Sequence, residues 1–324
     1  MTLTRGKMKI KRVAVSAVSF VKNATLVAEL KNLGNSLGFD VILNETQRVL
    51  DQTSLMDFFT EANADAAIVG TEIINGEVLA AAPSLRLIAK YGVGLDNLDE
   101  AELKRRGITL AWKAGVNKRS VSELVLAFAL GHFHKASVGI ATMRQGQWIK
   151  DGGVQLSDLR VGVVGFGHVG CDLSEILRAF GSDVVVHDIL DKNAEAAALG
   201  ARQVSYEELL TTSDLITFHV PATAATSGMF SARELAKVKP NALIVNTSRG
   251  SVLDFTAVAN AAVRGDIGGL AVDVYPAEPY RLESDWASCP TIYCTPHIGG
   301  NTREAVLAMG RAAIAGIREA LTED

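Results

Sequence analysis

Short apolar runs alternate with amphipathic stretches along almost the whole chain, and this alternation occurs in two separate series. The first series has amphipathic stretches such as 24–33 and 79–82, and its apolar runs lie at residues 13–18, 41–43, 66–69, 87–89 and 109–111. The second series begins at Arg160 and contains the runs RVGVVG, DVVVHD, DLITFHV, ALIVN, GLAVDVY and TIYCTP. Strands that alternate with helices are typical of a parallel sheet covered by helices. Because 324 residues are enough for two cores, the sequence predicts two α/β domains with doubly wound parallel sheets.

The stretch between the two series predicts a single long helix over residues 117–147. Its apolar residues recur at helical spacing on one face, and they include Val121, Leu124, Val125 and Phe128. The same spacing predicts a last helix over residues 301–321. The chain shows no repeat of the length that a solenoid protein would have.

A glycine motif follows the first strand of the second series. Gly165, Gly167 and Gly170 form G-x-G-x-x-G, with a strand before it and a helix predicted after it. These glycines allow a tight turn, a close approach to a pyrophosphate and close packing of helix against strand. The backbone amides at the helix start, around His168 and Val169, would face the phosphates. The motif therefore predicts a dinucleotide site.

Asp188 ends the next predicted strand, at the place where an acid accepts hydrogen bonds from the adenosine ribose. A 2′-phosphate would be repelled there, and the following residue, Ile189, offers no compensating cation. We therefore expect NAD rather than NADP. The alternative reading is that Asp188 caps a helix.

Three later strands of this series end in ionisable residues of different chemistry. Arg249 follows ALIVN, Asp273 and Glu278 follow GLAV, and His297 follows TIYC. Ligands bind at the carboxyl ends of such strands. A guanidinium can hold a carboxylate and polarise a carbonyl, an imidazole can exchange a proton, and a carboxylate can orient that imidazole. Taken alone, Arg249 could be a solvated loop arginine, but the set together fits hydride chemistry on a 2-keto acid.

The sequence resembles the D-isomer-specific 2-hydroxyacid dehydrogenase family over nearly its whole length. The motifs GFGHVG with Asp188, FHVPAT, NTSRG, DVYPAEP and TPHIGG stand in the family's order and spacing. The resemblance implies that Arg249 binds the substrate carboxylate, that His297 is the acid/base and that Glu278 is its partner. It also implies that the nicotinamide and adenosine halves of NAD are lined by Pro221, Thr226, Thr247, Ser248, Asp273 and Gly299.

The first domain carries a matching stretch, AKYGVGLDNLD, which resembles the family's loop for the substrate carboxylate. The resemblance implies substrate contacts from Lys90, Val93, Gly94 and Asn117, although Asn117 could equally be a helix N-cap. Where phosphoglycerate dehydrogenases have an arginine after the third strand, this chain has VGTEIING, and Lys90 takes the place of a second arginine. These side chains do not favour phosphoglycerate as the substrate.

The resemblance also implies the architecture. We expect a flavodoxin-like substrate domain from residues 1–116 and 297–324, and a Rossmann NAD-binding domain inserted at 117–296. The long helix after Asn117 would form the arm of a homodimer. The expected function is an NAD-dependent oxidoreductase for a small D-2-hydroxy acid or 2-keto acid. The alternatives are D-3-phosphoglycerate dehydrogenase itself and an NAD-sensing, corepressor-like binding protein of the same fold.

Charge and cysteine content limit the partners and the compartment. The net charge of −4 gives no overall positive field that would attract nucleic acid. The three cysteines lack the paired spacing of metal ligands and suit a reducing compartment, so we expect a cytoplasmic protein without a metal site. The apolar run after the basic N-terminus is expected to be a first strand rather than a signal peptide, and no stretch reaches the length of a membrane span.

Overall fold

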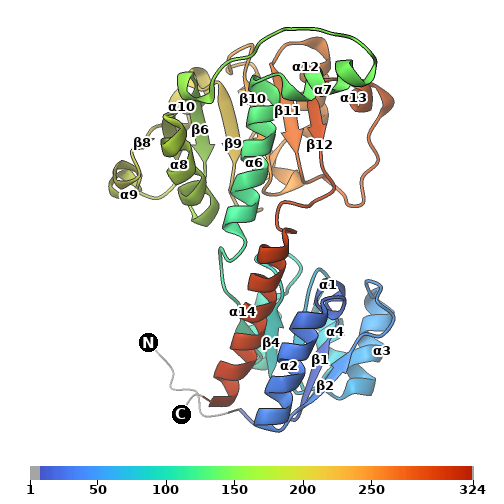
Figure 1. Cartoon of the computed structure of the whole chain (residues 1–324). Coiled ribbons are helices and arrows are strands. Elements are labelled where there is room, and N and C mark those ends of the chain that lie inside the picture. Colours follow the sequence, from blue (N-terminus) through green and yellow to red (C-terminus); the bar gives the residue numbers. More distant parts are fainter. Residues whose placement is uncertain (1–7, 323–324) are drawn as a thin grey trace. The chain divides into compact units, whose positions relative to one another are not determined.

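The computed structural model describes residues 8–322, and within them the chain forms two compact units, each built around its own parallel sheet (Figure 1). The first unit comprises the residues up to Asn117 together with those from Arg303 onward, and the second comprises Lys118–Thr302. The predicted α/β class with two doubly wound sheets is therefore confirmed.

The first unit is a five-stranded sheet of order β2-β1-β3-β4-β5, in which every neighbouring pair is parallel. Its strands are β1 (Arg12–Val15), β2 (Asp40–Leu43), β3 (Ala66–Val69), β4 (Leu87–Lys90) and β5 (Thr109–Ala111). Its helices are α1 (Val18–Val21), α2 (Ala24–Leu37), α3 (Gln52–Ala62), α4 (Gly76–Ala81), α5 (Glu100–Arg106) and α14 (Arg303–Thr322).

The two faces of this sheet have separate cores. Along β1, Val13 and Val15 pack into the core beneath α2 and α14, whereas Ala14 packs into the core beneath α3 and α4. This alternation follows from the period of two in a strand. Helix α14 lies beside α2 and β4, so the last segment of the chain completes the unit formed by the first (Figure 1).

The second unit is a seven-stranded parallel sheet of order β12-β11-β10-β9-β6-β7-β8. Its strands are β6 (Arg160–Val164), β7 (Asp183–His187), β8 (Arg202–Gln203), β9 (Leu215–Phe218), β10 (Leu243–Asn246), β11 (Gly269–Val272) and β12 (Ile292–Cys294). The strand order reverses between β6 and β9, which is where nucleotides bind in sheets of this kind.

Ten helical segments precede or connect these strands in the second unit. They are α6 (Lys118–Phe133), α7 (Ala136–Arg144), the 3₁₀ turns η1 (Leu156–Asp158) and η2 (Gly250–Val252), α8 (His168–Phe180), α9 (Asn193–Ala198), α10 (Tyr206–Thr212), α11 (Ala232–Leu235), α12 (Phe255–Arg264) and α13 (Ser284–Ser288). Their apolar faces cover the two sides of the sheet in two distinct cores.

Two expectations about the elements need correction. The single helix predicted over 117–147 is two helices, α6 and α7, which meet at an angle of 66°. The break falls at Lys135, whose φ of +55° is left-handed and cannot continue a right-handed helix. The first strand ends at Val15 rather than at residue 18, because α1 begins at Val18.

The second boundary between the units also differs from the expected one. Residues 297–302 belong with the second unit, six residues further along the chain than expected. The cause is the Asp273 carboxylate beyond β11, which accepts hydrogen bonds from the backbone N–H groups of Ile298 and Gly299, both at 2.7 Å. The division of roles between the two units stays a prediction.

Candidate active site

The turn that carries Arg249 is held by the last residue of β10. The Asn246 side chain accepts hydrogen bonds from the Ser248 N–H at 3.0 Å and the Ser248 hydroxyl at 2.8 Å, and it donates to the Arg249 carbonyl at 2.8 Å. A Cβ atom at Gly250 would lie 2.0 Å from the Tyr275 carbonyl group, so only glycine fits there. The turn is therefore fixed, and Arg249 is half-buried at the carboxyl edge of the sheet.

Glu278 and His297 form a hydrogen-bonded pair at the ends of β11 and β12. Glu278 Oε2 lies 2.7 Å from His297 Nδ1, and the two side chains remain 37% and 51% exposed. The second oxygen, Oε1, accepts from the Tyr275 N–H at 3.1 Å. A carboxylate at Nδ1 orients the ring and leaves Nε2 as the nitrogen that can exchange a proton.

The backbone of His297 is left-handed, with φ of +54°, and this conformation is uncommon for a residue with a side chain. Asp273, which is 1% exposed, holds this turn through hydrogen bonds to its carboxylate. Its carboxylate accepts from the Thr295 hydroxyl at 2.6 Å as well as from the N–H groups of Ile298 and Gly299. From the other side, the Ser120 hydroxyl of α6 donates to the Gly299 carbonyl at 2.5 Å.

The strands β10, β11 and β12 are neighbours in the sheet, so Arg249, Glu278 and His297 all follow adjacent parallel strands at the same edge. The sequence indicated these three residues. It assigned no contact to Ser120, Tyr275 or Thr295, which lie in stretches that resemble the family and whose contacts hold the turn. Asp273 was expected to contact nicotinamide; its carboxylate is engaged by the His297 turn, and the contact with nicotinamide stays a prediction.

The glycine motif has the shape that a pyrophosphate site requires. Gly165 follows β6 with φ of +94°, and a Cβ there would lie 2.6 Å from the His219 carbonyl oxygen. A Cβ at Gly170 would lie 2.2 Å from the Gly165 carbonyl oxygen, whereas Gly167 has open space before it. Helix α8 begins at His168, so the first backbone N–H groups of the helix have no intrahelical acceptor and can bind an anion at this loop.

The other residues expected to line the cofactor lie on the same edge of the sheet. Asp188 directly follows β7, and its two carboxylate oxygens accept from the Phe166 N–H at 2.7 Å and the Leu190 N–H at 3.0 Å. The Thr226 hydroxyl closes the turn after β9 by donating to the Pro221 carbonyl at 2.5 Å. The buried Thr247 hydroxyl has no hydrogen-bond partner within residues 8–322. An unsatisfied hydroxyl and a glycine loop at the same edge of the sheet fit a dinucleotide bound there.

The expected substrate loop follows β4 in the first unit. Gly92 has φ of +126°, and the Val93 carbonyl beside Gly94 accepts from the Trp112 indole N–H at 3.0 Å. Asn117 is buried and immediately precedes α6, which is the position of an N-cap. No contact described here tests whether Val93, Gly94 or Asn117 binds substrate.

Lys90 is buried within the first unit. Its ammonium donates to the Gly70 carbonyl and, at 2.8 Å, to the Asn97 side chain. Glu72, also buried, accepts from the Gly70 N–H at 2.7 Å. These contacts join the loop after β3 to the loop after β4. Lys90 therefore has a clear structural role, and its contact with substrate stays a prediction.

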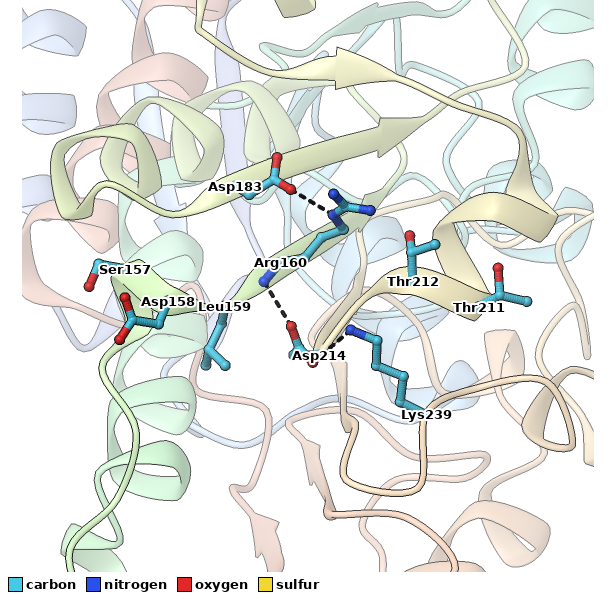
Figure 2. Close-up of a pocket in the computed structure, with 9 residues that line it drawn as sticks. All are labelled: Ser157, Asp158, Leu159, Arg160, Asp183, Thr211, Thr212, Asp214 and Lys239. Carbon is cyan, nitrogen blue, oxygen red and sulfur yellow. Dashed lines mark hydrogen bonds and ion pairs between the residues drawn. The ribbon is translucent and has the colours of Figure 1, made fainter.

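A cavity of about 490 Å³ lies at the opposite, amino-terminal edge of the seven-stranded sheet (Figure 2). Four of its charged side chains form two ion pairs: Arg160 Nε lies 2.6 Å from the Asp183 carboxylate, and Lys239 Nζ lies 2.9 Å from that of Asp214. This hollow is separate from the strand ends that carry Arg249 and His297. In the described part of the chain, no group of three or more His, Cys, Asp or Glu residues is arranged to hold a metal ion.

Within residues 8–322, no single helix is long and apolar enough to cross a membrane. The bent pair α6 and α7 meets that test jointly, by length and composition alone, and α6 is largely buried against the second unit's core.

Comparison with known proteins identifies relatives of both units. Residues 126–299 match the family model described as "D-isomer specific 2-hydroxyacid dehydrogenase, NAD binding domain". A D-3-phosphoglycerate dehydrogenase of Mycobacterium leprae is 34% identical over 273 residues, which are 84% of this chain and 51% of that protein. A glyoxylate reductase of Thermococcus litoralis is 35% identical over 260 residues, which are 78% of each chain.

A solved structure supports the same assignment. The crystal structure of a putative D-isomer-specific 2-hydroxyacid dehydrogenase from Polaromonas superposes with a TM-score of 0.83, at 26% identity, over 96% of each chain. The present chain spans about half the length of the phosphoglycerate dehydrogenase and nearly four fifths of the glyoxylate reductase.

Proposed function

Because this chain belongs to the D-isomer-specific 2-hydroxyacid dehydrogenase family, we propose that it is an NAD-dependent oxidoreductase. Its reaction transfers a hydride between nicotinamide and C2 of a small D-2-hydroxy acid or 2-keto acid. The observation that carries this proposal is the 2.7 Å contact between Glu278 and His297, on strands adjacent to the one that presents Arg249.

Each of the three residues has a distinct role in the proposed reaction. The Arg249 guanidinium binds the carboxylate of the 2-keto acid through paired hydrogen bonds and polarises the neighbouring carbonyl. His297 supplies a proton to that oxygen as the carbonyl is reduced, and it accepts a proton in the reverse direction. Glu278 keeps the imidazole oriented, and the charge of the carboxylate stabilises the ring when both nitrogens are protonated.

The chain carries the family's NAD-binding domain, and its residues fit that cofactor. Gly165, Gly167 and Gly170 would admit the pyrophosphate, the amides of His168 and Val169 would bind its oxygens, and Asp188 would accept from the ribose hydroxyls. NAD supplies the hydride acceptor, which no protein side chain can provide. Ile189, which is 95% exposed beside Asp188, offers no charge to a 2′-phosphate, and this supports NAD over NADP.

We propose a small 2-keto acid rather than phosphohydroxypyruvate as the substrate. The loop after β3 presents the buried acid Glu72, and the buried cation Lys90 donates to Gly70 and Asn97. D-3-phosphoglycerate dehydrogenase remains the alternative activity, because two relatives with that name are 34% and 35% identical to this chain over 84% and 80% of its length. A corepressor-like protein that binds NAD without turnover is the second alternative.

Steady-state oxidation of NADH with a panel of 2-keto acids tests these readings. The panel contains glyoxylate, pyruvate, hydroxypyruvate and phosphohydroxypyruvate. We expect turnover with at least one unphosphorylated acid, and we expect His297→Ala to lower kcat by about a hundredfold or more, because general acid–base transfer contributes that much. A preference for phosphohydroxypyruvate would favour phosphoglycerate dehydrogenase. NAD binding without turnover of any acid would favour the binding protein.

We further propose that the protein is a cytoplasmic homodimer that pairs through α7 and the loop that follows it. No residue of α7 is buried, and the exposed apolar side chains of this segment are Ile140, Met143, Trp148, Ile149 and Val154. Several large exposed apolar side chains within one short segment are typical of an interface between subunits. The free cysteines suit the cytoplasm, and the net charge of −4 favours neither nucleic acid nor an anionic membrane.

Sedimentation equilibrium measures the mass of the particle directly. We expect twice the mass of the chain for the wild type, and monomers for the double variant Met143→Glu with Trp148→Glu. A monomeric wild type at micromolar concentration would contradict the dimer.

A further inference from the structure

Tyr275 lies three residues past the end of β11, between Asp273 and Glu278, and the function proposed above does not use it. Its backbone is confined, because a Cβ on Gly250 in the Arg249 turn would lie 2.0 Å from the Tyr275 carbonyl. The residue is half-buried, and it contacts all three loops that carry the proposed chemistry.

Two hydrogen bonds connect Tyr275 to the Glu278–His297 pair. The backbone N–H donates to Glu278 Oε1 at 3.1 Å, so one end of the residue fixes the carboxylate. The hydroxyl donates to the Thr295 carbonyl at 2.9 Å, so the other end fixes the chain two residues before His297. The same Thr295 carbonyl also accepts the His297 N–H at 3.0 Å.

The tyrosine ring is itself rigidly supported. It stacks on Tyr280 with ring centroids 5.1 Å apart and planes 7° apart, and it meets Phe255 edge-on at 5.9 Å. Burial, with a smaller effect from Cys294, raises the pKa of Tyr275, so the hydroxyl stays protonated and remains a donor. A half-buried ring that packs against two other rings holds its hydroxyl in one position.

We propose that Tyr275 is a positioning residue for the catalytic pair, with its hydroxyl setting the His297 turn and its backbone setting Glu278. The left-handed backbone of His297 persists only where surrounding contacts impose it. Asp273 holds the side chain of Thr295 and the N–H groups after His297, and Tyr275 holds the carbonyl before it. Among the described contacts, removing the hydroxyl leaves the Thr295 carbonyl with the His297 N–H as its one donor, so the imidazole samples orientations that Glu278 does not stabilise.

Tyr275→Phe tests the proposal, with Tyr280→Phe as the matched control. Both changes remove one hydroxyl from the same ring stack, but the Tyr280 hydroxyl makes no hydrogen bond with any residue that the structure describes. The inference rests on the proposed dehydrogenase activity for its kinetic readout. We expect Tyr275→Phe to lower kcat for the preferred 2-keto acid about three- to tenfold, the effect of one hydrogen bond. KM for NADH and the melting temperature should stay near wild type, and Tyr280→Phe should change neither constant.

A second readout does not depend on turnover. In protein labelled with ¹⁵N at histidine, we expect a low-field proton signal from His297 Nδ1, because this N–H is hydrogen-bonded to the Glu278 carboxylate. The signal is assigned by its absence from the spectrum of His297→Gln. We expect this signal to broaden or move upfield in Tyr275→Phe and to be retained in Tyr280→Phe. If the wild type turns over no 2-keto acid, the proposed function fails, and this signal alone decides the role of Tyr275. Identical spectra and identical kcat for the two variants would overturn the proposal.

Discussion

Arg249 is a charged side chain three residues past the end of β10, a strand whose four residues are all buried. Its turn is shaped by the Asn246 side chain and by the space that Gly250 leaves, so the guanidinium is presented in a defined place. We expect Arg249→Lys to lower kcat/KM at least tenfold, because lysine cannot reproduce a planar, paired contact and a charge-assisted hydrogen bond contributes ~1.5–3 kcal/mol. Steady-state kinetics of keto-acid reduction measure the change. Wild-type constants for the variant would mean that Arg249 is a solvated loop residue.

A second prediction at the residue scale concerns Asp188 and the choice between NADH and NADPH. Its carboxylate is fixed by the N–H groups of Phe166 and Leu190, and a 2′-phosphate would be repelled by it. We expect the wild type to use NADH with a higher kcat/KM than NADPH, and we expect Asp188→Ala to narrow that ratio. The measurement is kcat/KM with each cofactor at one saturating keto-acid concentration. A wild-type preference for NADPH would show that the assigned role is wrong.

Residue types could be predicted from the sequence where chemistry demands them, but the residues that hold them in place could not. Arg249, Glu278 and His297 stand at strand ends, where a parallel sheet gathers its functional side chains. The contacts that hold the turn are made by hydroxyl groups. Those of Ser120 and Tyr275 donate to backbone carbonyls, and that of Thr295 donates to the Asp273 carboxylate. Neither spacing nor polarity predicts which carbonyl a hydroxyl will donate to. The left-handed backbone at residue 297 could not be predicted either, because the residue is histidine and not glycine.

Among the elements, most strands could be predicted because they are apolar runs, and some, such as β3 and β10, are buried at every residue. The two-residue strand β8 was not predicted, because neither Arg202 nor Gln203 is apolar. β3 and β5 have the predicted limits, and β10 matches the run that ends at Asn246. The break between α6 and α7 could not be predicted, since apolar spacing continues through it and Lys135 is an unusual residue to adopt a positive φ. Helix α14 was predicted over nearly its whole length, from Asn301 rather than from Arg303.

Packing of α14 against β5 leads to a prediction about two glycines. A Cβ at Gly316 would lie 2.4 Å from the Ala111 Cβ, whereas a Cβ at Gly76, the first residue of α4, would make only ordinary contacts at 3.7 Å. Overpacking costs about 1–3 kcal/mol, which exceeds the gain of about 1 kcal/mol in helix propensity. We expect Gly316→Ala to lower the midpoint of urea unfolding and Gly76→Ala to leave it unchanged or raise it. Equal midpoints for the two variants would contradict this packing.

At the scale of the whole molecule, the two units carry separate cores and separate sheets. The two α/β series could be counted from the sequence, because each strand carries its own signal. The return of the chain from the second unit to the first could be placed only to within several residues, since it depends on Asp273 binding the backbone beyond His297. A contact between residues 25 positions apart leaves no local trace in a sequence.

The free energy of unfolding should depend on pH through His219, which follows β9 and lies against the glycine motif. Burial lowers the pKa of His219 to about 3, and the Thr217 hydroxyl is 2.9 Å from Nε2. Between about pH 6.5 and pH 3 the unfolded chain binds a proton that the folded chain does not, so stability is lost as the pH falls, by about 1.4 kcal/mol per pH unit. From pH 7 to pH 5 this loss is about 2 kcal/mol.

His219→Gln removes the titrating group, so we expect its stability to fall by about 2 kcal/mol less than that of the wild type over this interval. Urea unfolding at each pH gives the comparison, and His134→Gln, which removes an exposed histidine, controls for the loss of an imidazole as such. Parallel curves for the wild type and His219→Gln would mean that His219 is protonated in the folded protein as readily as in the unfolded chain.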